Sequence, residues 1–175
     1  LYNNTTASNN TAVGYQALLD NSTGTQNVAL GAFAGQNITT GVDNIALGSY
    51  ALNDLTTGGQ NVAVGDQSLY NTTGSQNVAV GDLAGYSNQT GENNAFLGRF
   101  AGYSSTSGDN TYIGGNAGYL ISSGTGNTIL GRYNGNQYGI DIRTLSNRIV
   151  LSDGDGNPRL IINNTGYTQM SPSLS

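Results

Sequence analysis

Oxygen-bearing side chains alternate with glycine near the end of this sequence. Asp153, Asp155 and Asn157 have the spacing with which calcium-binding loops begin. Pro158 stands where such a loop needs an invariant glycine, and Asn164 stands where it needs a bidentate glutamate. Because Asp-Gly is a strong turn signal, the segment favours a polar hairpin turn. We therefore expect neither a bound metal nor a cofactor.

Tyrosines recur at regular intervals and form a second candidate site. Tyr86, Tyr103 and Tyr119 each follow an Ala-Gly pair, and Tyr70 takes the equivalent place before them. If they stack, such rings could bind sugars, or they could seal an edge of the fold, where amphipathic rings are favoured. Sealing is the favoured interpretation. The same two interpretations apply to aromatic residues that follow a repeated glycine by two positions, namely Phe33, Tyr50, Phe100 and Tyr133.

The remaining chemistry argues against an enzyme. The chain of 175 residues has no His and no Cys, which removes the commonest general base and the thiol nucleophile. Its ten carboxylates are scattered, with no spacing that suggests the pair a glycosidase needs. The only cations are five Arg residues, and the net charge is −5, so nucleic-acid binding is not expected. No apolar stretch approaches the roughly 20 residues that span a bilayer, so membrane insertion is not expected.

The elements that position these residues come from a short repeat. A pentad that begins with Asn, has a large aliphatic residue fourth and ends with Gly occurs eight times, at intervals of 16 or 17 residues. The first and last residues of the eight copies are Asn10 and Gly14, Asn27 and Gly31, Asn44 and Gly48, Asn61 and Gly65, Asn77 and Gly81, Asn94 and Gly98, Asn110 and Gly114, and Asn127 and Gly131. A period this short cannot hold a helical hairpin. It fits one coil of a β-solenoid with two short strands and two turns.

Alternation along the pentad predicts which side chains share a face. The fourth residue, as in Leu30 and Leu47, is always a large aliphatic, which we assign to the interior of the coil. The third residue stays small over five coils, which favours close contact with another subunit over contact with water. This predicted subunit interface consists of Ala12, Ala29, Ala46, Ala63, Ala79, Phe96, Tyr112 and Ile129.

Stacking of the coils predicts two further features. Strands about 4.8 Å apart would let the asparagines hydrogen-bond to one another as a ladder, and eight coils would extend to roughly 40 Å. Each coil buries only a few large apolar groups, whereas ordering a residue costs about 1–2 kcal/mol in backbone entropy. Copies of the chain that pack against one another with closed rotational symmetry would bury further apolar surface and stabilise such a fold. We therefore expect a symmetric homo-oligomer, and the family resemblance described next implies a homotrimer.

The run of pentads from Asn10 to Gly135 resembles the head repeats of YadA-like trimeric autotransporter adhesins and the related repeats of bacteriophage tail fibres. The resemblance implies a left-handed parallel β-roll over residues 1–135, three of which associate around a fibre axis. Residues 136–175 predict a separate C-terminal β-strand module. Its segment from Ser146 to Asn157 resembles the part of phage fibres that precedes a self-cleaving chaperone, and an end at Ser175 fits such a cleavage. We also expect the chain, which begins at Leu1, to be part of a longer protein.

These observations favour an extracellular structural protein. The leading hypothesis is a phage tail-fibre segment on the virion surface, which positions or contributes to binding of a cell-surface glycan or protein receptor. One alternative is the head of a bacterial adhesin on the cell surface, and another is a tailspike segment that degrades polysaccharide. An ice-binding solenoid should display a regular threonine array. Thr11, Thr111 and Thr128 instead share their position with aliphatic residues.

Overall fold

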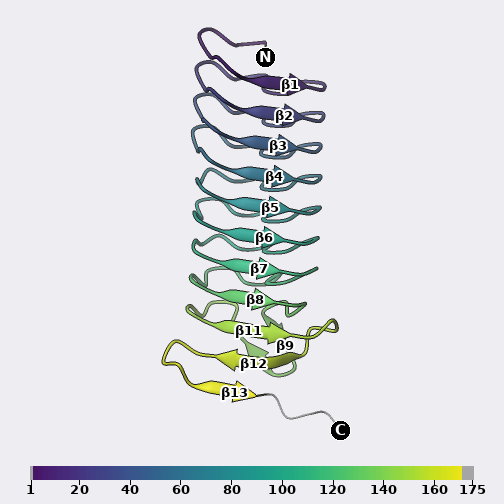
Figure 1. Cartoon of the computed structure of the whole chain (residues 1–175), viewed down its shortest axis with the longest axis vertical. Coiled ribbons are helices and arrows are strands. Elements are labelled where there is room, and N and C mark those ends of the chain that lie inside the picture. Colours follow the sequence, from purple (N-terminus) through teal and green to yellow (C-terminus); the bar gives the residue numbers. More distant parts are fainter. Residues whose placement is uncertain (1, 171–175) are drawn as a thin grey trace.

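The computed structural model describes residues 2–170, and these residues fold as an all-β solenoid (Figure 1). Eight parallel strands of three residues each stack along the long axis in sequence order. They are β1 (Thr11–Val13), β2 (Val28–Leu30), β3 (Ile45–Leu47), β4 (Val62–Val64), β5 (Val78–Val80), β6 (Ala95–Leu97), β7 (Thr111–Ile113) and β8 (Thr128–Leu130). Each strand is the centre of one repeated pentad, so the predicted solenoid of about eight coils is confirmed.

The strands pair with no shift in register from one coil to the next. Ala29 pairs with Ala46, and Ala46 pairs with Ala63. The glycine that ends each pentad permits this close stacking. Gly48 has a φ of 140°, and a Cβ added to it would lie 2.3 Å from the carbonyl oxygen of Gly65. Any other residue at this position would push two coils apart, because heavy atoms cannot approach so closely.

The second strand that the sequence predicted for each coil is absent from the described residues. The return segment of the coil is a run of turns in which two positions per coil have positive φ, as in Phe33 (59°), Tyr50 (54°) and Leu52 (51°). Adjacent coils still hydrogen-bond here, since the Leu18 N–H donates to the Ala34 carbonyl at 3.0 Å and the Gly35 N–H donates to the Ala51 carbonyl at 2.8 Å. The return segments therefore form a second hydrogen-bonded wall without regular strand geometry.

The core lies between the strands and the return segments. Ala46 and Ala63 point into it from the strands, and Leu52 and Leu55 point into it from the return segment of the same coil as Ala46. All four side chains are buried, with at most 1% of their surface exposed. The interior is therefore a thin column that runs the length of the stack.

The stack does not end at the boundary predicted after residue 135. Strand β11 (Ile149–Ser152) pairs parallel with β8, and its Val150 is buried beneath Ile129. The intervening loop contains the two-stranded pair β9 (Asn136–Gln137) and β10 (Ile140–Asp141). Strands β12 (Pro158–Ile162) and β13 (Thr168–Met170) then extend the same sheet in antiparallel fashion. The first part of the predicted C-terminal module thus continues the solenoid sheet, and Ser175 lies outside the described residues.

Candidate functional sites

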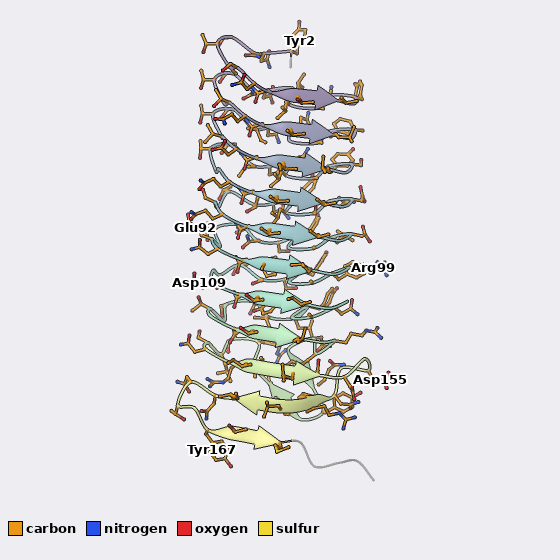
Figure 2. The ribbon with its side chains drawn as sticks, in the orientation of Figure 1. Tyr2, Glu92, Arg99, Asp109, Asp155 and Tyr167 are labelled. Atoms are coloured by element: carbon orange, nitrogen blue, oxygen red, sulfur yellow. The ribbon has the colours of Figure 1, made fainter. Side chains whose placement is uncertain are left out.

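A continuous row of aliphatic side chains points outward from the parallel strands. We call it the outer sheet face, and its aliphatic residues are Val13, Val28, Leu30, Ile45, Leu47, Val62, Val64, Val78, Val80, Leu97, Ile113, Leu130, Ile149 and Leu151. Thr11, Ala95, Thr111 and Thr128 lie on the same face of the strands. Leu30 exposes 52% of its surface and Val80 exposes 40%. In Figure 2 this sheet lies between an edge that carries Glu92 and Asp109 and an opposite edge that carries Arg99. The face combines regular geometry with side chains that water solvates poorly.

The predicted assignment of the two strand faces is therefore wrong. The third residues of the pentads, assigned above to a subunit interface, point into the core of their own coil; they are Ala12, Ala29, Ala46, Ala63, Ala79, Phe96, Tyr112 and Ile129. The fourth residues, assigned to the interior, point outward. The physical reason is the thinness of the coil: where the return segment fills the interior with leucine, as in the coils of Ala46 and Ala63, the facing strand has room only for alanine. Small side chains here indicate a narrow core.

The predicted asparagine ladder is present in the core. Asn61 donates from its Nδ2 to the Oδ1 of Asn44 at 3.1 Å and to the Gly74 carbonyl at 3.0 Å. Its own Oδ1 accepts from the backbone N–H of Asn77 at 3.0 Å. The ladder ends where the Arg148 N–H donates to the Oδ1 of Asn127 at 2.9 Å. These bonds satisfy backbone groups that the turns leave unpaired inside the protein.

The repeated tyrosines form one stacked column on the return segments. Tyr70 and Tyr86 have ring centroids 5.3 Å apart, Tyr86 and Tyr103 are 5.2 Å apart, and Tyr103 and Tyr119 are 5.0 Å apart. All three pairs are nearly parallel, with interplanar angles of 20° or less. Phe100 packs edge-on against this column, and Arg99 lies 4.2 Å above the Phe100 ring. The sequence thus predicted the stacking of these rings correctly.

A second aromatic row precedes this column and occupies another position in the coil. Tyr15, Phe33 and Tyr50 lie in successive coils, and the rings of Phe33 and Tyr50 stack at 4.6 Å. The two rows meet between Tyr50 and Tyr70, where the centroids separate to 6.2 Å and the rings tilt by 48°. At this break the surface has a hollow of about 280 Å³, lined by Tyr50, Gln67, Tyr70 and Tyr86. Tyr133, the last aromatic of the predicted set, is instead buried, and its hydroxyl donates to the Ile140 carbonyl at 2.8 Å.

The glycine-rich acidic segment forms the turn between β11 and β12, as predicted. Asp153 accepts hydrogen bonds from the backbone N–H groups of Asp155 (3.1 Å) and Asn157 (2.9 Å) and from the Arg159 guanidinium. These partners, led by the Asn157 side chain, lower the pKa of Asp153 to about 2. Within residues 2–170 no group of three or more Asp or Glu side chains could hold a metal ion.

A second hollow lies beside the loop between β8 and β11. It has a volume of about 310 Å³ and is lined by Leu120, Ser122, Asp141, Arg143 and Thr144. The Arg143 guanidinium donates to both carboxylate oxygens of Asp141, at 3.0 and 2.7 Å. This bonding lowers the pKa of Asp141 and raises that of Arg143. The two charges satisfy each other, so the hollow offers little to a charged ligand.

Sequence reasoning missed the outer sheet face as a candidate interface. A signal for it was present: the return segments carry buried large residues such as Leu18, Leu52 and Leu69, which leave no room for a large residue on the facing strand of those coils. Comparisons of the chain with protein-family models, with curated proteins and with solved structures found no match. Among residues 2–170 there is no helix long and apolar enough to cross a membrane.

Proposed function

We propose that this chain is a structural segment of an extracellular homotrimeric fibre, in which three left-handed β-rolls pack through their outer sheet faces. The observation that carries the proposal is the continuous aliphatic surface of that face over nine coils. Exposed apolar surfaces of this extent generally mark an interaction site. A second copy of the same chain fits because the face repeats with the period of the strands and has no charged side chain among its residues.

Closed symmetry explains why the face would meet copies of itself. Three identical rolls around one axis each bury the same surface, and the assembly ends at a defined number of subunits. The number three rests on the resemblance to trimeric adhesin heads and phage fibres. Burial of an aliphatic side chain contributes about 1.5–3 kcal/mol relative to its exposed state, so even partial burial of the row gives a large driving force.

The fibre would act as a rigid spacer. Coil-to-coil hydrogen bonds along both walls and the asparagine ladder resist bending of the roll, and three packed rolls would be stiffer still. Within this proposal the chain belongs to a phage tail fibre and holds a receptor-binding tip away from the virion. The head of a bacterial adhesin, the alternative to a phage fibre, would have the same trimeric arrangement of β-rolls. A membrane anchor or a chaperone encoded beside this segment would distinguish the two.

Mass measurement and two adjacent substitutions test the proposal. By sedimentation equilibrium the wild-type chain of 18.0 kDa should have three times that mass. Val80→Asp places a charge on the outer sheet face, so this variant should keep its β-sheet circular dichroism while it dissociates to monomers. The neighbouring Ala79→Asp is the matched comparison; it buries an unpaired charge in the core and should unfold the coil. A wild-type chain that stays monomeric at all concentrations would overturn the proposal, as would a Val80→Asp variant that stays trimeric.

A further inference from the structure

The break in the aromatic column has the features of a binding site rather than of a seal. Within the column, Tyr86 and Tyr103 each have a stacked ring on both sides. Between Tyr50 and Tyr70 the tilt of 48° opens a wedge that uncovers part of a ring face. The hollow of about 280 Å³ lies at this wedge. Its volume is close to the lower limit of about 300 Å³ for small-molecule sites, which suits one or two sugar rings.

The break arises from a change in sequence pattern between two coils. In the coil of Tyr50 the aromatic residue follows the strand glycine by two positions, and in the coil of Tyr70 it follows by five. Gln67 takes the place in its coil that Tyr50 takes in the preceding one. A polar amide therefore replaces a ring at this point, and the floor of the hollow can both donate and accept hydrogen bonds.

The polar groups around the hollow have unused capacity for hydrogen bonds. The hydroxyl groups of Tyr50, Tyr70 and Tyr86 bond to no other group in residues 2–170. Gln67 uses one donor, from its Nε2 to the Oδ2 of Asp66 at 3.1 Å, which leaves its amide oxygen free. Asp54 also lies near, and together with burial it raises the pKa of Tyr70. Several hydroxyl-binding groups thus surround an exposed ring face.

We propose that the hollow lined by Tyr50, Gln67, Tyr70 and Tyr86 binds a neutral pyranose sugar of a cell-surface glycan. The C–H hydrogens on one face of a pyranose carry partial positive charge, and the face of an aromatic ring carries partial negative charge, so the two stack favourably. Gln67, the tyrosine hydroxyls and Asp66 then bond the sugar hydroxyls. Asp54 and Asp66 disfavour uronic and sialic acids, because they would repel a carboxylate.

The inference does not depend on trimer formation. The hollow is lined by residues of the return segments in successive coils of a single chain, whereas the proposed subunit contact lies on the outer sheet face. A failure of sugar binding would therefore leave the fibre proposal standing, and the reverse also holds.

Ligand-detected NMR can test this site on the intact chain. The probes are maltose, lactose and N,N′-diacetylchitobiose, with sorbitol as an acyclic polyol, glucuronic acid as an anion and choline as a cation. The chain contains no Trp, so its fluorescence comes mainly from its 11 tyrosines, and a change on binding offers a second readout because Tyr50, Tyr70 and Tyr86 line the hollow. At least one neutral disaccharide should show saturation transfer and change the fluorescence, whereas sorbitol should do neither. Preferential binding of glucuronic acid or choline would overturn the proposal, as would silence of all three disaccharides.

Two pairs of variants locate the binding. Tyr70→Ala should weaken binding about tenfold, which corresponds to about 1.4 kcal/mol. Its control is Tyr119→Ala, which removes a ring at the same position of the repeat, three coils after Tyr70 and outside the hollow, and should leave affinity unchanged. Gln67→Ala should likewise weaken binding, and Gln16→Ala, at the equivalent place in the first coil, should not. If Tyr119→Ala lowered affinity as much as Tyr70→Ala, the hollow would not be the site.

Discussion

At the scale of single residues, the asparagine that begins each pentad connects one coil to the next. Its side chain acts as both donor and acceptor, so an asparagine such as Asn61 satisfies groups in the coil before it and in the coil after it. Asn61 bonds to Asn44, to Gly74 and to Asn77, and it is fully buried. No other side chain of this size offers two donors and an acceptor, which explains why the position does not vary among the eight pentads.

Asn61→Ala should strongly destabilise the fold. The substitution leaves the Asn77 N–H and the Gly74 carbonyl buried without these partners, and each orphaned group costs about 1–3 kcal/mol. We therefore expect a loss of roughly 2–6 kcal/mol in the free energy of unfolding, measured by denaturant titration. The control is Asn71→Ala in the same coil, because the Asn71 side chain makes no hydrogen bond within residues 2–170. Equal stability of the two variants would contradict this role for the ladder.

At the scale of the coil, the size of the buried strand side chain is related to the size of the side chain that faces it from the return segment. Where the strand supplies alanine, as in Ala46 and Ala63, the return segment supplies Leu52 and Leu69. Where the strand supplies Phe96, the return segment has Gly102, and a Cβ on that glycine would lie 2.5 Å from the phenylalanine ring. In these coils a large side chain on one wall faces a small one on the other. The coils of Ala29 and Ala79 instead have glycine at this return position, and at Gly85 the side chains of Leu69 and Phe96 from the neighbouring coils take up the space.

A double-mutant cycle on Phe96 and Gly102 tests this relation in size. Phe96→Ala alone should cost about 3–5 kcal/mol through the cavity it leaves. Gly102→Leu alone should also destabilise, since its side chain would overlap the ring. The combined variant recreates the pairing of Ala46 with Leu52, whose φ of 51° shows that leucine adopts this backbone conformation. It should be more stable than the sum of the single changes predicts, by at least about 1 kcal/mol. Strict additivity would show that the two positions do not share space.

The sequence predicted the coil but not its orientation. The spacing of Asn27, Asn44 and Asn61 fixed the period, the strand positions and the ladder, because these follow from local pattern alone. Alternation along Val28-Ala29-Leu30 shows only that two faces exist, and it cannot tell which of them meets the return segment. Which face of the strand points inward depends on the volume of return-segment residues such as Leu52. Leu52 lies six positions after Ala46, and a turn with positive φ separates the two. The hollow beside Tyr70 was equally hidden, since it arises from a change of position between two coils.

At the scale of the whole molecule, the stack is a one-dimensional array whose ends have one neighbour instead of two. In such arrays stability is close to a sum of coil terms and contacts between neighbours, so the ends fray first. At the C-terminal end the direction of the sheet changes at the turn between β11 and β12, where it becomes antiparallel. Asp153 holds this turn through Asn157 and Arg159. We therefore expect the protection of the β12 and β13 backbone amides from hydrogen exchange to depend on the negative charge of Asp153.

Acid should loosen this end of the stack before the rest. The pKa of Asp153 is about 2 in the folded chain, below the value of about 3.9 for an unfolded aspartate. Its stabilising effect is therefore complete above about pH 4 and is lost as the pH falls towards 2. Amide protection, which is the factor by which exchange is slower than in an unfolded chain at the same pH, should fall first in β12 and β13 over this range. Asp153→Asn should show the faster exchange already at neutral pH and depend less on acid, whereas Asp155→Asn, in the same turn, should behave as wild type. Uniform acid sensitivity along all coils would instead place the effect outside this turn.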